Sequence, residues 1–161
     1  MVPIPFQPHG WWLRFCHPQS GYDRISIAML AATDDPFISY APGGSRQYPD
    51  APYPGMEQTR DAWLAAMRIS GPPEFDKLPD AVQGDSYKPQ GGRTSSTIER
   101  HRYRLGPESQ ELWYYKAEGM GHSWPNPTQS WSGLWELFGK TNQDIDFADE
   151  AWTFFQRHVK R

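Results

Sequence analysis

Two short segments of this chain carry side chains that can exchange protons. Residues 119–125, Gly-Met-Gly-His-Ser-Trp-Pro, place His122 between a pair of glycines and a Trp-Pro step. Glycines permit backbone angles and close approaches that a β-carbon would block, and Trp124 offers a rigid wall beside the imidazole ring. A histidine held in this way suits catalysis as a general base. The alternative is a histidine that only forms a hydrogen bond within a turn.

The second segment, residues 33–36, is Thr-Asp-Asp-Pro and directly follows an apolar run. Functional groups in α/β proteins gather just beyond the carboxyl ends of strands, which is where Asp34 and Asp35 would lie. A histidine takes the proton of a nucleophilic serine, and a carboxylate beside it fixes the tautomer and stabilises the imidazolium. The alternative is an ordinary turn, because Asp before Pro often opens one.

The elements that must position these segments are expected to be strands and a helix. The apolar run at residues 25–32 is typical of a parallel strand buried on both faces, and residues 56–69 have the period of an amphipathic helix. Residues 74–93 have little apolar content and indicate an extended surface loop. Residues 95–104 and 110–117 predict two strands joined by a turn, so His122 should lie in the loop that leaves the second strand.

The first of these two strands carries a basic cluster. Its members are Arg100, His101, Arg102 and Arg104. Charge on an edge strand is an ordinary protection against pairing with other sheets. We favour that explanation over a phosphate-binding site.

The chain after His122 is expected to be helical. Residues 130–138 predict a short helix, and Asp146 can cap a final one, with acidic residues in its first turn and basic residues in its last, as the helix dipole prefers. The stripe expected to face the core comprises Ala148, Ala151, Trp152, Phe155 and Val159.

Length and composition restrict the remaining possibilities. A chain of 161 residues suits one domain, and eight each of Trp, Tyr and Phe predict a core built from aromatic side chains. A net charge of −3 argues against a general nucleic-acid binder, and no apolar run is long enough to span a membrane. A metal site at Cys16 and His17 is not expected, because no second ligand follows at a suitable spacing.

Three motifs together resemble the polyhydroxybutyrate depolymerase and feruloyl esterase-like branch of the α/β-hydrolases. They are residues 33–40 with Gly43 and Gly44, residues 119–125, and residues 144–148 with 152–155. The chain order of a carboxylate, a histidine and a terminal helix agrees with the triad order of these hydrolases. The resemblance covers roughly residues 25–158.

The resemblance implies roles for three residues. Asp35, directly before Pro36, would be the acid of a Ser-His-Asp triad, with Asp34 the weaker candidate; His122 would be the base, and Trp124 would line the acyl or aryl pocket. It implies a small ester or a polyester as substrate, no cofactor and no metal. It also suggests a secreted enzyme, although the N-terminus does not resemble a signal peptide.

The sequence departs from this family at the nucleophile. No serine has glycine two positions away on both sides, as the G-x-S-x-G elbow requires. We therefore expect an α/β fold that is the C-terminal portion of an α/β-hydrolase sheet with flanking helices, incomplete and inactive alone. Residues 1–24 would be an irregular segment and residues 25–161 the hydrolase part. A truncated coding sequence or a second chain would account for the missing N-terminal half.

Two other functions fit the sequence. One is a binding module without catalysis, whose flat indole faces contact a carbohydrate or a polymer. Its candidates are Trp11, Trp12, Trp113, Trp124, Trp131 and Trp135. The other is a pseudoenzyme remnant of a hydrolase.

Overall fold

The computed structural model describes residues 25–45, 49–50, 53–84, 95–106, 110–128 and 135–158. Its elements, in chain order, are β1 (Ile27–Ala32), α2 (Met56–Ala66), β2 (Glu74–Lys77), β3 (Thr97–Arg104), β4 (Glu111–Glu118), α3 (Trp135–Phe138) and α4 (Phe147–Arg157). The segment 1–24, with its expected irregular structure, lies outside the described residues.

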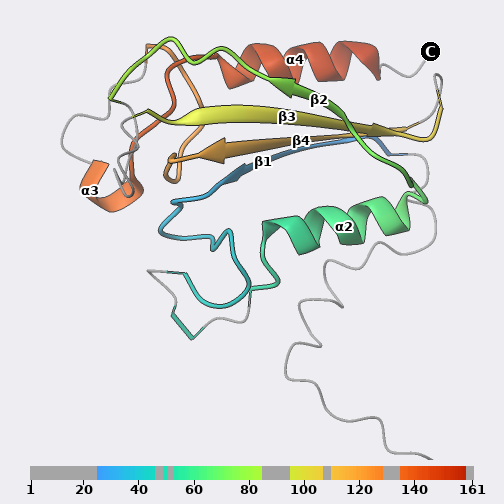
Figure 1. Ribbon diagram of the computed structural model, residues 1–161, viewed down its shortest axis with the longest axis horizontal. Helices are drawn as coiled ribbons and strands as arrows, with labels where there is room; N and C mark the ends of the chain where they lie inside the picture. The colour runs from blue at the N-terminus through green and yellow to red at the C-terminus, as the bar shows by residue number, and fades with distance from the viewer. Residues whose placement is uncertain are drawn as a thin grey trace, which may run out of the picture.

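The strands form one mixed sheet in the order β1-β4-β3-β2. β1 pairs with β4 in parallel, and the other two pairings are antiparallel. Helices α4 and α2 lie on opposite faces of this sheet (Figure 1). The α/β class is thereby confirmed, and so is the parallel pairing of the strand that precedes Asp35. Only Ala31 and Ala32 of that strand are buried, because β1 has a neighbour on one side only among the described residues.

The core on both faces of the sheet is built around β4. Its first five residues are all buried, and alternate side chains point to opposite faces. Trp113 and Tyr115 face α4, where they pack with Phe147 and Phe154. The neighbouring Leu112 and Tyr114 belong to the cluster that α2 covers. Aromatic side chains thus form much of this core, as the composition predicts.

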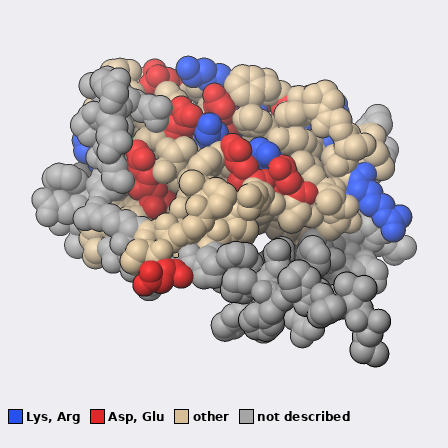
Figure 2. All heavy atoms as spheres, turned by 60° about the horizontal axis from the view of Figure 1, so that its bottom comes forward, with Lys and Arg blue, Asp and Glu red and all other residues tan. Residues whose placement is uncertain are grey.

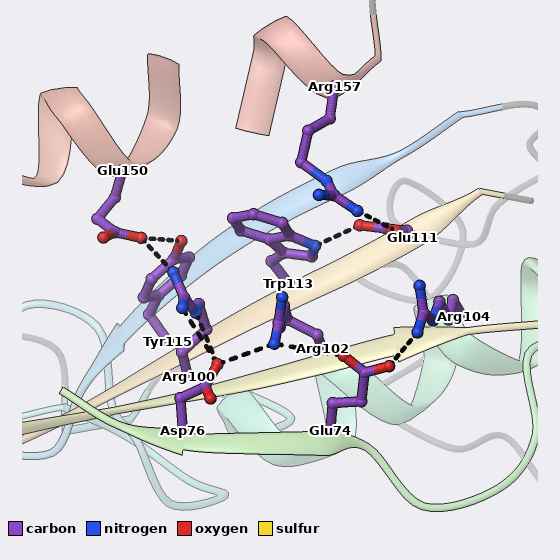
Figure 3. Close-up of polar contacts among 10 residues, drawn as sticks. All are labelled: Glu74, Asp76, Arg100, Arg102, Arg104, Glu111, Trp113, Tyr115, Glu150 and Arg157. Carbon is purple, nitrogen blue, oxygen red and sulfur yellow. Dashed lines mark hydrogen bonds and ion pairs between the residues drawn. The ribbon is translucent and has the colours of Figure 1, made fainter. Parts of the chain in front are cut away.

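The basic cluster on β3 does not protect a sheet edge, so that prediction was wrong. Residues 74–77, expected to belong to a surface loop, form β2, and β2 is the edge strand beside β3. Residues two apart in a strand share a face, so Glu74 and Asp76 meet the arginines of β3. Arg104 pairs with Glu74, and Arg102 contacts Asp76 at 3.2 Å (Figure 3).

Arg100 joins the sheet to α4. Its guanidinium contacts Asp76 at 3.1 Å and Glu150 of α4 at 2.7 Å, and Glu150 also accepts a hydrogen bond from the Tyr115 hydroxyl at 2.8 Å. Figure 3 shows Glu150 and Arg157 reaching down from the helix toward the strands. These contacts fix which side of α4 faces the sheet.

The expected orientation of α4 was therefore wrong, although its cap was right. Asp146 accepts a hydrogen bond from the backbone N–H of Ala148. The buried residues, however, are Phe147 and Phe154, and Trp152 and Phe155 are 62% and 59% exposed. Glu150 and Arg157 lie on the sheet side of the helix, where their partners are. Of the predicted stripe, Ala148, Trp152 and Phe155 are exposed and Ala151 is half-buried, and Val159 lies outside the described residues.

Glu111 at the start of β4 makes folding stability depend on pH. Burial alone would raise the pKa of this carboxyl, but hydrogen bonds from the Trp113 indole and the Arg157 guanidinium outweigh that effect and lower the pKa. A carboxyl whose pKa is lower in the folded state stabilises the fold above its unfolded pKa, about 4.3, and loses this contribution as pH falls through the folded value.

We therefore expect the free energy of unfolding to fall more steeply with decreasing pH, below about pH 5, than it would without the Glu111 carboxyl. Urea titrations between neutral and acidic pH measure it, with Glu111→Gln as the isosteric control that cannot ionise. Below about pH 5, the free energy of unfolding of the variant should change less steeply with pH than that of the wild type. Equal slopes in the two proteins would show that Glu111 does not titrate with a lowered pKa.

Charges of both signs are mixed on the molecular face that carries α2. Figure 2 shows Asp and Glu side chains interspersed with Lys and Arg over the described part of this face. Opposite charges at short distances weaken each other's field, so this face gives little long-range attraction for a polyanion. Among the described helices, none combines the length and the apolar character needed to cross a bilayer.

Candidate active site

The structure brings Asp35 and His122 together. The Nδ1 atom of His122 lies 2.7 Å from Oδ2 of Asp35. The parallel register that pairs Ala32 with Ala117 places the carboxyl ends of β1 and β4 at one edge of the sheet, so the loops that leave these strands meet there. The side chain of Asp35 is 11% exposed and that of His122 is 42% exposed. The acid of this pair is thus sheltered, and the imidazole is open to solvent.

The turn at residues 35–38 orients the carboxylate of Asp35. Its Oδ1 atom accepts hydrogen bonds from the backbone N–H groups of Phe37 at 2.7 Å and Ile38 at 2.9 Å. The other oxygen is left for His122. The Asp-Pro segment therefore forms a turn, and this turn also orients the Asp35 carboxylate toward His122.

Hydrogen bonds between strand ends fix the distance between the two loops. The Thr33 amide donates to the carbonyl of Ala117 at 2.9 Å, and the Gly119 amide donates to Oγ1 of Thr33 at 2.9 Å. The Asp34 amide donates to the Met120 carbonyl. Asp34 therefore ties the loops together through its backbone, while its neighbour contacts the imidazole.

The glycines of the histidine loop have the roles that the sequence predicts. Gly119 has φ +76°, a left-handed conformation that favours glycine. Gly121 packs so tightly that a β-carbon there would lie 2.3 Å from the carbonyl oxygen of Phe138. This close approach allows the amide of His122 to donate to the same oxygen at 2.6 Å. The backbone of His122 is thereby fixed against the end of α3.

The aromatic neighbour of the imidazole differs from the expected one. The ring of Phe37 lies 4.9 Å from the His122 ring, centroid to centroid. Trp124 instead packs edge-on against Phe147 at 5.1 Å and is 60% exposed. The expectation that Trp124 forms the wall beside His122 was therefore wrong, and its place in a substrate pocket stays a prediction. Phe37 was missed, although its position two residues after Asp35 placed it in the same turn.

The hydrogen bond to Asp35 determines what His122 can do. An ionised carboxylate only accepts hydrogen bonds, so Nδ1 carries the proton and donates it. In the neutral ring, Nε2 then has a free lone pair and is the basic nitrogen. The pair is thus arranged to take a proton at Nε2 while Asp35 stabilises the resulting positive charge.

Other candidate residues do not add to this site. Within the described residues, no three His, Cys, Asp or Glu side chains gather as metal ligands would, and Cys16 and His17 lie outside them. Of the tryptophans considered for a binding surface, Trp113 is buried in the core and has no free face. Trp11, Trp12 and Trp131, and the side chain of Trp135, lie outside the described part of the structure.

Comparison with family models, with curated proteins and with solved structures found no match to this chain.

Proposed function

We propose that this chain supplies the acid and the base of a Ser-His-Asp triad in a carboxylic ester hydrolase. The enzyme would be of the polyhydroxybutyrate depolymerase and feruloyl esterase-like kind, acting on a small ester or a polyester. The single observation that carries the proposal is the 2.7 Å contact between His122 Nδ1 and Asp35 Oδ2 beyond two adjacent parallel strands. The resemblance of residues 33–40 and 119–125 to that family gives the pair its proposed reaction.

In the proposed reaction, Nε2 of His122 accepts the proton of a serine hydroxyl as the serine oxygen attacks the ester carbonyl. The imidazolium then gives this proton to the departing alkoxide, which leaves as an alcohol. Water repeats the cycle on the acyl-enzyme, with His122 again the base, and releases the carboxylic acid. Asp35 stays ionised throughout and holds the ring in the Nδ1–H tautomer.

The serine would approach Nε2, the ring nitrogen of His122 that does not contact Asp35. The 161 residues contain no G-x-S-x-G elbow, so the proposal assigns no serine among them. A purified chain of these residues is therefore expected to show no triad turnover of p-nitrophenyl butyrate and no labelling by a fluorophosphonate, which reacts with activated serines.

The DNA upstream of the Met1 codon provides the decisive comparison. A chain extended to an in-frame G-x-S-x-G should hydrolyse p-nitrophenyl butyrate and should be labelled at that serine. If the chain of 161 residues alone hydrolyses the ester strongly and His122→Ala abolishes this activity, the chain contains a nucleophile, which would contradict the proposal. An extended chain that folds but has no esterase activity would refute the proposed function and favour a pseudoenzyme.

A further inference from the structure

Phe37 lies between the imidazole and a second aromatic ring. It is tilted by 51° against His122 and stacks on Phe138 at 5.5 Å with an angle of 28°. Phe138 is the last residue of α3, and its carbonyl oxygen holds the amide of His122. Phe138 therefore supports His122 in two ways: its carbonyl oxygen holds the backbone, and its ring supports the imidazole through Phe37.

The His122 ring needs such support because its hydrogen bond is accessible to water. With its side chain 42% exposed, water can compete for the Nδ1 proton. Rotation of an imidazole about its Cβ–Cγ bond is also soft, since torsions next to a planar ring are broad. One in-plane hydrogen bond to Asp35 does not by itself prevent the ring from turning out of plane, whereas a ring packed beside it does.

From this geometry we infer that Phe37 is a positioning residue that holds the His122 imidazole in line with Asp35, with Phe138 as its backing. The inference rests on the proposed function for its catalytic meaning, but the geometry can be tested without turnover. The turn that aims the Asp35 carboxylate, through the amides of Phe37 and Ile38, also presents the Phe37 ring. Asp35 and Phe37 thus reach His122 as one rigid unit.

NMR of the full chain with ¹⁵N-labelled histidine tests this role. The wild type should show a downfield Nδ1–H resonance and ¹⁵N shifts of the Nδ1–H tautomer, assigned to His122 by their absence in His122→Gln. Phe37→Ala should lose the resonance to solvent exchange and mix the tautomers. Phe37→Leu, which restores apolar bulk, should recover the resonance. Phe155→Ala, a matched truncation on α4, should leave it unchanged.

The proposal is overturned if the wild type lacks the resonance, if Phe37→Ala keeps it, or if Phe155→Ala loses it as well. Should Phe37→Ala fail to fold, Phe138→Ala decides, because it leaves the Phe37 ring in place without its backing. Faster exchange of the Nδ1 proton is then expected, and unchanged exchange refutes the role. Absence of esterase activity in a chain extended to an in-frame G-x-S-x-G would count against the proposed function and leave these spectra unaffected.

Discussion

Replacing His122 by alanine is expected to lower kcat by about 10³- to 10⁶-fold in an enzyme that contains this chain together with its serine. The loss follows from the geometry of the pair. Without the imidazole, no group accepts the serine proton as the acyl-enzyme forms, and none returns it to the leaving alkoxide. Initial rates on p-nitrophenyl butyrate at saturating substrate measure the effect. A change of less than tenfold would refute the role of His122 as the base.

Asp35→Asn is also expected to lower kcat, because the amide nitrogen of asparagine can donate a hydrogen bond where the carboxylate accepted one. The imidazole would then favour the wrong tautomer, and removal of a triad aspartate in this way costs about 10⁴-fold in kcat. Asp34→Asn is the matched control, since Asp34 joins the loops through its backbone amide, which the substitution keeps. Equal losses in the two variants would indicate general damage to the turn and would contradict the assignment of Asp35.

The loops that carry Asp35 and His122 were within reach of sequence reasoning because the determinants of each loop are local. The apolar run before Asp35 and the aromatic run before His122 predict two strands, and the glycines around His122 predict a tight loop. That the two loops meet was implied by the family resemblance, and the parallel pairing of β1 with β4 brings them to one edge of the sheet. Phe37 is local in the same sense, since it belongs to the turn of Asp35.

The errors concern contacts between elements that are far apart in the chain. Residues 74–77 have too little apolar content to indicate a strand, and they form one because Glu74 and Asp76 meet arginines of β3. The sequence of β2 or of β3 taken alone does not predict this pairing. The register of the two strands determines it, and register depends on the whole sheet.

The error in the predicted orientation of α4 also comes from contacts between distant elements. Taken alone, the helix presents its widest apolar stripe around Trp152 and Phe155, which predicts burial of that side. In the structure, Glu150 turns toward Arg100 and Tyr115, and Arg157 turns toward Glu111. These partners lie on β3 and β4, so the helix sequence alone could not reveal which side would face the sheet.

Two adjacent phenylalanines of α4 therefore allow a direct test of the fold. Phe154 is 2% exposed and meets Trp113 edge-on at 5.4 Å, whereas Phe155 is 59% exposed. Phe154→Ala would remove a buried ring and leave a cavity between α4 and the sheet, which costs about 3–5 kcal/mol. Phe155→Ala changes a largely solvated side chain and should stay within about 0.5 kcal/mol of the wild type.

Urea unfolding of the two variants measures this difference, and the pair controls for helix propensity because both substitutions introduce alanine into neighbouring positions of one helix. The stripe predicted from the sequence gives the opposite order, with Phe155 the costly position. A larger loss at Phe155 than at Phe154 would therefore overturn the orientation of α4 and, with it, the contacts of Glu150 and Arg157 with the sheet. A loss of about 3 kcal/mol or more at Phe154 alone would show that the side of the helix that carries Phe154, rather than its widest apolar stripe, faces the core.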